Sequence, residues 1–184
     1  MSTQEDLRSI ALAEFASAGY GATSLHRIAE LAGLSKSSVL YHYTSKEQLL
    51  EAAIGPAIDR MAAILEPFPG QGPYNDREAF LARFVDFLLE CRLEVNIFIN
   101  QGPSLHDVPV IDRANALVLQ LAQFFSATAE SLEEQMRFGI ALGGAAYMLC
   151  ASDTLDVVED VPTDETREAL IAILSDLLSP VYNR

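Results

Sequence analysis

The chain has 184 residues, of which 50% are hydrophobic and 21% are charged, and its formal net charge is −14. This composition excludes a disordered protein, and the length is sufficient for one or two packed domains. The net charge argues against nucleic-acid binding by the molecule as a whole. The charge is unevenly spread, however: residues 1–50 carry −1, whereas Gly21–Lys46 holds three cations against one anion. Either rare residues fall there by chance, or an acidic body directs this segment towards DNA.

The first third of the chain predicts closely spaced helices. A capping pattern at Ser2 and Glu5 opens an amphipathic helix that ends at Gly19-Tyr20-Gly21. A second capping pattern, at Ser45 and Gln48, opens a longer helix that can kink at Gly55-Pro56. The expected helices after the first are at about 24–32, 36–43 and 46–65.

The rest of the chain also predicts helices and no convincing strand. Glu66–Pro73 contains three prolines and two glycines and is expected to be a linker. The expected helices beyond it are at about 76–93, 95–101, 109–128, 131–151 (opened by a capping pattern at Ser131 and Glu134) and 163–179, ending before Pro180. The fold class is therefore all-α, with a three-helix helix-turn-helix domain over 1–50 and a helical ligand-binding and dimerisation domain over 51–184.

Residues 23–49 carry the most informative pattern. Ala29 and Ala32 are small enough for two short helices to cross closely. Gly33 lies where the turn requires positive φ, and Ser35 can cap the second helix. These features are typical of a helix-turn-helix, whose second helix enters the major groove of DNA. A helical hairpin with a solvated polar face is the alternative.

The second helix of this motif groups side chains that reach phosphates and base edges. Lys46, at the start of the next helix, is expected to meet the DNA backbone from the flank. Together with residues nearer the first helix, the expected DNA-binding set is Thr23, Ser24, His26, Ser35, Lys36, Ser37, Ser38, Tyr41, His42 and Lys46.

The segment resembles the DNA-binding domain of TetR-family (tetracycline-repressor-like) regulators. The matching residues are Gly21, Thr23-Ser24, Ile28-Ala29, Ala32–Lys36, Tyr41-His42-Tyr43, Ser45-Lys46-Glu47 and Leu49. The resemblance implies that His26 faces DNA, although it could equally be an ordinary surface histidine. Leu40 departs from the family, which most often has a DNA-facing tyrosine there. Leu40 either touches a thymine methyl group or packs inward.

The resemblance implies a homodimer built from the last two long helices. The glycines and alanines of 131–151 permit close helix approach, and 163–179 has more apolar surface than one packed face needs. Burial of these helices within their own chain is the alternative. A two-fold dimer predicts a palindromic operator. The expected interface residues are Gly139, Gly143, Tyr147, Leu170, Leu174 and Leu177.

The resemblance also implies a small-molecule effector, of unknown identity, that moves the helix at 46–65 and releases the DNA. The expected pocket residues are Phe84, Phe87, Leu88, Phe98, Asn100, Phe124, Met136 and Tyr147, with further polar candidates at Asn96, Gln101 and His106. Core packing is the alternative for the apolar members of this set. The Asn100–Pro103 stretch fits a helix end better than a ligand site.

Several function classes find no support in the sequence. No motif indicates a metal, nucleotide or haem, so no cofactor is expected. The few histidines and cysteines are dispersed, and Asp153–Asp160 fits a solvated acidic loop, so an enzyme is not expected. Cys91 and Cys150 are expected to be buried thiols of a cytoplasmic protein without a membrane partner. The prediction is a ligand-responsive DNA-binding regulator, by default a repressor; the alternative is a helix-turn-helix regulator that acts through protein contacts.

Overall fold

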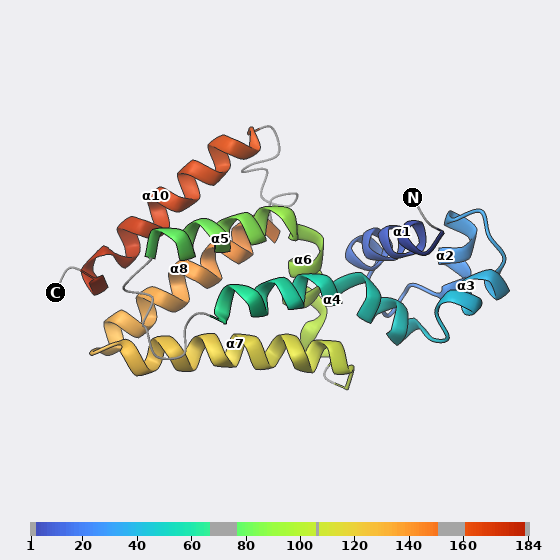
Figure 1. Cartoon of the computed structure of the whole chain (residues 1–184), viewed down its shortest axis with the longest axis horizontal. Coiled ribbons are helices and arrows are strands. Elements are labelled where there is room, and N and C mark those ends of the chain that lie inside the picture. The colour runs from blue at the N-terminus through green and yellow to red at the C-terminus, as the bar shows by residue number, and fades with distance from the viewer. Residues whose placement is uncertain (1–2, 67–76, 106, 151–160, 183–184) are drawn as a thin grey trace. The chain divides into compact units, whose positions relative to one another are not determined.

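The computed structural model describes residues 3–66, 77–105, 107–150 and 161–182, and all regular structure in these ranges is helical (Figure 1). The all-α prediction is therefore confirmed. No described helix is long and apolar enough to cross a lipid bilayer. The elements are α1 (Thr3–Ala18), α2 (Leu25–Leu31), α3 (Lys36–His42), α4 (Lys46–Leu65), α5 (Arg77–Glu90), α6 (Arg92–Gln101), the short 3₁₀ helix η2 (Gly102–Ser104), α7 (Pro109–Thr128), α8 (Leu132–Cys150) and α10 (Thr163–Tyr182).

The capping patterns set helix starts as predicted. The Ser45 hydroxyl accepts a hydrogen bond from the Gln48 amide at 3.1 Å, and the Ser131 hydroxyl accepts one from the Glu134 amide at 3.2 Å. Each bond satisfies an amide in the first turn that has no partner within its own helix. The pattern at Ser2 lies outside the described residues, as do the predicted linker and the acidic loop.

Pro56 and Pro180 each lie within a helix and do not end it. α4 continues through Pro56, and α10 continues through Pro180 to Tyr182, so the prediction that the last helix stops before Pro180 is wrong. A proline lacks the N–H that would bond to the preceding turn. Only two residues of α10 follow Pro180. The hydrogen bond that the proline cannot donate is therefore lost near the end of the helix, where carbonyl groups already lack partners.

The chain divides into two compact units. The first consists of Met1–Asp59 and Leu93–Ala114, and the second of Arg60–Arg92 and Asn115–Arg184. The chain therefore passes from one unit to the other within α4, after the first residue of α6, and within α7. The predicted domain division after residue 50 stays a prediction.

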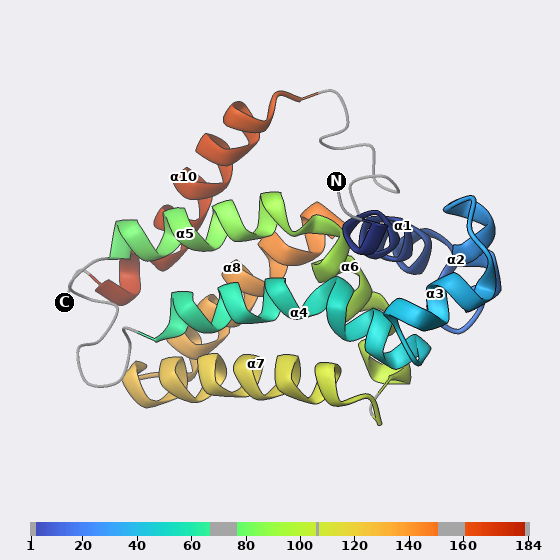
Figure 2. The ribbon, with the colours of Figure 1, turned by 45° about the vertical axis from the view of Figure 1, so that its right-hand side comes forward.

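In the first unit α2 packs against both α1 and α3 (Figure 2). The fully buried side chains of this unit are Leu7, Ala11, Phe15, Ile28, Val39, Leu49, Leu50, Ile97 and Ile111. The guanidinium of Arg113, in the first turn of α7, bonds to both Glu51 and Asp59 of α4. These two carboxylates lie on either side of Pro56, so Arg113 bridges the point where α4 lacks a backbone hydrogen bond.

In the second unit α5 packs against α10 and α8 (Figures 1 and 2). Phe125 and Phe138 stack with ring centroids 4.0 Å apart, and Phe80 packs against Phe125 at 6.2 Å. The predicted thiols are not disulfide-bonded; Cys91 is buried and Cys150 is half-buried. Burial raises the pKa of the Cys150 thiol to about 11.

Candidate nucleic-acid interface

The turn between α2 and α3 has the backbone geometry that a helix-turn-helix requires. Gly33 has φ of 66°, as predicted, and its amide donates to the Glu30 carbonyl at 3.1 Å. The Leu34 amide donates to the Ala29 carbonyl at 2.9 Å, which completes a Schellman motif. A β-carbon at Gly33 would have no atom within 4 Å, so the backbone conformation, not space, favours glycine.

Serine hydroxyls cap both helices of the motif. The Ser24 hydroxyl accepts from the Arg27 amide, and the Ser35 hydroxyl accepts from the Ser38 amide, each at 3.1 Å. Ser35 Oγ also lies 2.8 Å from the hydroxyl oxygen of Ser37. Ser24 and Ser35 therefore have a structural task at a helix start, in addition to any contact with DNA.

The outer face of α3 presents aromatic and polar groups. Tyr41 is 85% exposed and makes an edge contact with the His42 ring, with centroids 5.2 Å apart. Val39, on the opposite face, is fully buried. Leu40 is 38% exposed, so it is not fully packed inward, and its contact with a thymine methyl group stays a prediction.

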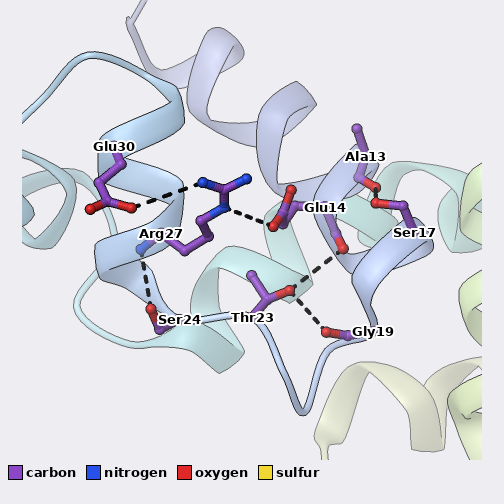
Figure 3. A network of polar contacts seen from close by, with 8 residues as sticks. All are labelled: Ala13, Glu14, Ser17, Gly19, Thr23, Ser24, Arg27 and Glu30. Atoms are coloured by element: carbon purple, nitrogen blue, oxygen red, sulfur yellow. Dashed lines mark hydrogen bonds and ion pairs between the residues drawn. The ribbon is translucent and has the colours of Figure 1, made fainter.

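Arg27, one of the three cations of this segment, is paired with carboxylates (Figure 3). Arg27 Nε lies 3.1 Å from a Glu14 carboxylate oxygen, and Arg27 Nη1 lies 4.0 Å from Glu30. The exposed His26 ring also lies against Glu30, at 3.4 Å. Lys36 is exposed and makes no hydrogen bond or ion pair within the described residues. Lys36 is thus the cation that α3 offers to an anionic partner.

Thr23 does not face solvent, contrary to the prediction. Its side chain is buried, and its hydroxyl donates to the Gly19 carbonyl at 2.9 Å (Figure 3). The Thr23 amide donates to the same carbonyl at 3.1 Å. Thr23 therefore closes the turn between α1 and α2, a role that accounts for a threonine at this position without a DNA contact.

Lys46 also differs from the prediction of a contact with the DNA backbone. Its half-buried side chain donates to the carbonyl oxygens of Tyr20 at 2.9 Å and Thr23 at 3.0 Å. The ammonium lies 4.1 Å from the centroid of the Tyr20 ring, in cation–π geometry. Burial, with the nearby carboxylate of Glu47, raises the pKa of Tyr20 to about 12, so the ring stays a neutral phenol.

Gln101 is a residue of this site that sequence reasoning missed. Its Oε1 accepts from the Tyr20 amide at 2.6 Å, and its Nε2 donates to the Phe15 carbonyl at 2.8 Å. The sequence placed Gln101 at a helix end, which is confirmed because α6 ends there, and otherwise offered it only as a polar candidate for the effector pocket. No local pattern connects Gln101 with partners more than 80 residues earlier, so no sequence signal was available.

The predicted effector-binding residues occupy different environments. Phe84, Phe87 and Leu88 are buried in the second unit, where Phe124 is half-buried. In the first unit Phe98 is half-buried and Asn100 is exposed, and His106 lies outside the described residues. Met136 and Tyr147 are 57% and 55% exposed. The described residues contain no group of three or more His, Cys, Asp or Glu side chains that could hold a metal ion.

The outer face of α8 is apolar, as the dimer prediction requires. Its exposed side chains include Leu132, Met136, Ile140 and Tyr147, and Gly139 and Gly143 are exposed between them. On α10, Ile173 is 55% exposed, whereas Leu170 and Leu177 are half-buried. Leu174 is only 1% exposed, so its placement at the interface is wrong: the side chain packs within its own chain.

Comparison with known proteins connects this geometry to a family. The sequence pattern of "Bacterial regulatory proteins, tetR family" matches residues 7–53, which include α2, α3 and the turn between them. The match covers residues 7–53 only, so the similarity to this family is shown for the N-terminal part of the chain. Among curated proteins of this kind, the HTH-type transcriptional regulator RutR of Escherichia coli (strain K12) is 43% identical over 60 residues. That alignment covers 33% of this chain and 28% of RutR, so the chain matches less than a third of the length of this relative.

Solved structures extend the similarity to the whole fold. The ketosteroid transcriptional regulator KstR2 of Mycobacterium tuberculosis has a TM-score of 0.72 over 97% of this chain and 94% of that chain, with 16% identity. SCO3833 of Streptomyces coelicolor A3, a member of the TetR transcriptional regulator family, has a TM-score of 0.71 over 97% and 92%, with 23% identity. At these identities the similarity shows the fold alone.

Proposed function

We propose that the chain is a dimeric, DNA-binding transcriptional regulator that inserts α3 into the major groove of its operator. The observation that carries this proposal is the outer face of α3. A Schellman turn and the Ser35 cap hold α3, Val39 anchors it in the core, and Tyr41 and Lys36 face solvent. A rigid helix with exposed aromatic and cationic side chains is suited to contact phosphates and base edges.

The charge distribution supports a binding mode with few cations. Arg27 is paired with carboxylates and Lys46 is bonded to carbonyl groups, so Lys36 is left as the exposed lysine of α3. Hydroxyl groups, amides and the Tyr41 ring then provide the remaining contacts, including those of Ser37, Ser38 and His42. Each Lys36 that neutralises a phosphate contributes about −0.9 to the slope of log affinity against log salt, or about −2 per dimer.

Dimerisation through the outer faces of α8 and α10 fits the exposed apolar side chains of both helices. Leu132, Met136 and Ile140 recur every four residues along one face of α8, and Ile173 is the exposed counterpart on α10. An apolar strip of this length is expected to be covered in solution. A two-fold dimer presents two copies of α3 to successive major grooves, which requires a palindromic operator.

Regulation by a small molecule is supported by the resemblance of residues 7–53 to TetR-family regulators. α4 begins four residues after α3 ends, so a change in α4 reaches the recognition helix directly. An effector that binds better to a state with a different spacing of the two α3 helices would release the operator. We propose repression as the default outcome, and the residues predicted for the effector pocket remain the candidates for it.

A second function is favoured by one observation. Because Glu14 and Glu30 compensate Arg27, the motif has little net positive charge at its surface, as expected of a helix-turn-helix that contacts a protein partner instead of DNA. The two functions predict different results with DNA: a DNA-binding regulator shows affinity that falls as salt is raised, whereas a regulator that contacts only proteins shows no such binding.

Fluorescence anisotropy with DNA from the promoter of the chain's own gene tests the proposal. Binding that weakens steadily as salt is raised, with one dimer per palindromic site, is the expected result. A double variant, Lys36→Ala with Tyr41→Ala, should lose this binding while keeping the helical content of the wild type. Wild-type protein that shows no salt-sensitive binding to this DNA would favour the protein-contact alternative.

A further inference from the structure

The turn between α1 and α2 is held by side chains from two other helices. Lys46, the first residue of α4, donates to the carbonyl groups of Tyr20 and Thr23. Gln101, the last residue of α6, bonds to the Tyr20 amide and the Phe15 carbonyl. The peptide groups of Gly19–Thr23 thus connect α1, α4 and α6 at the point where the chain enters the helix-turn-helix.

The Gln101 side chain uses both ends of its amide group in this contact. The Phe15 carbonyl lies in the last turn of α1, where carbonyl groups have no donor within the helix. The Tyr20 amide follows Gly19, whose φ of 90° takes the chain out of α1. The Gln101 side chain therefore bonds to a carbonyl group before Gly19 and to an amide after it. Gly19 is the residue at which the chain leaves α1.

The end of α6 is itself fixed, which allows Gln101 to act as a reference point. Ile97, four residues earlier and on the same face of α6, is fully buried. After Gln101 the chain turns through η2, where a β-carbon on the buried Gly102 would lie 3.7 Å from the ring of Phe98. These contacts determine where the Gln101 amide is placed.

A displacement at this turn reaches α3 through short steps. Thr23 in the turn is followed by Ser24, which caps α2 through the Arg27 amide. α2 packs against α3, and Ile28 of α2 and Val39 of α3 are both fully buried. The orientation of α3 therefore depends on the turn that Gln101 holds.

We propose that Gln101 is a positioning residue for DNA binding: by bonding to both sides of the α1–α2 turn, it fixes the orientation in which α2 and α3 meet the operator. The inference rests on the proposed function. The inference requires no contact between Gln101 and DNA.

The variant Gln101→Met tests this inference because methionine has a similar length and can neither accept from Tyr20 nor donate to Phe15 as an amide does. Loss of two hydrogen bonds is expected to lower operator affinity roughly tenfold in the folded protein. The slope of affinity against salt should not change, because no phosphate contact is removed. Hydrogen exchange at the Tyr20 amide should become faster.

Two further variants separate positioning from general stability. Gln123→Met makes the same substitution at an exposed position of α7 and should leave affinity and Tyr20 exchange unchanged. Gln101→Glu keeps an acceptor for Tyr20 but loses the donor to Phe15, so its affinity should lie between those of the wild type and Gln101→Met. All affinities are measured well below the melting temperature of each variant.

The outcomes that overturn the inference are distinct from those that overturn the function. If Gln101→Met is folded and binds the operator within twofold of the wild type, the contact is only structural. If Tyr20 exchange is the same in Gln101→Met and the wild type, Gln101 does not hold the turn. Wild-type protein that binds no DNA would overturn the proposed function, and the inference with it.

Discussion

Gly33 shows how one backbone angle supports the helix-turn-helix. Its φ of 66° is unfavourable for residues with a side chain, although space for one is present. We expect Gly33→Ala to lower the free energy of unfolding by about 1 kcal/mol. Chemical denaturation measures this change.

Gly21→Ala is the matched control, because it also has open space for a β-carbon but no positive φ. It should be neutral or slightly stabilising. Equal losses in the two variants would show that the backbone angle at Gly33 is not the cause.

Lys36 is the side chain on which the ionic part of operator binding depends most. We expect Lys36→Ala to weaken binding and to reduce the salt slope by about 2 for a dimer that carries two copies. Lys36→Arg keeps the charge and should keep the slope. A slope unchanged in Lys36→Ala, measured by anisotropy titrations at several salt concentrations, would show that Lys36 does not contact phosphate.

Residue roles could be predicted where sequence neighbours determine them. Gly33 and Ser45 act on the backbone within a few residues, so their roles were visible in the sequence. The bonds of Lys46 to backbone carbonyl groups were missed, because an ammonium group bonds equally well to a phosphate and to a carbonyl; its contact with the DNA backbone stays a prediction. Thr23 bonds to Gly19 only four residues away, so its local role was open to prediction and was missed. Gln101 bonds to Tyr20, 81 residues away, which only the fold brings close.

At the level of elements, a polar contact connects α5 and α10. Arg167 donates from Nε and Nη2 to the two carboxylate oxygens of Asp86, at 2.5 and 3.2 Å. This guanidinium lowers the pKa of Asp86, against a smaller opposing effect of burial. The pair stabilises the fold above the pKa of an unfolded aspartate, and this contribution is lost as pH falls through the lower pKa of the folded state.

We therefore expect Asp86→Asn to lower the melting temperature at pH 7 by roughly 1–2 °C, because a partly exposed pair is screened by solvent. The difference from the wild type should shrink as pH is lowered below about 4. Calorimetric melting curves over this pH range provide the measurement. Asp176→Asn, on an exposed position of α10, serves as the control; an equal effect there would exclude the ion pair as the cause.

Helix positions followed closely from hydrophobic periodicity and capping residues, because both act within one or two turns. The exception was the end of α10, where a rule for helix interiors was applied to a proline in the last turn. The grouping of α6 with the first unit could not be predicted, since it depends on contacts between residues far apart in the chain.

For the whole molecule, the exposed face of α8 predicts the oligomeric state. Ile140 is 63% exposed, and we expect Ile140→Glu to shift the protein from dimer to monomer because a charge would be buried at the interface. Sedimentation velocity measures this change. The control is Leu119→Glu on α7, where a leucine is 58% exposed. A monomer in the control, or a dimer in Ile140→Glu, would contradict the proposed interface.

The two-part first unit also has a consequence for synthesis of the protein. Ile97, Gln101 and Arg113 belong to this unit, yet they leave the ribosome well after Asp59. At about 5–20 residues per second, the interval up to Ala114 lasts roughly 3–11 s. Until Gln101 has been made, the turn between α1 and α2 lacks the side chain that bonds to both of its sides. The N-terminal unit therefore matures only when the middle of the chain has been made.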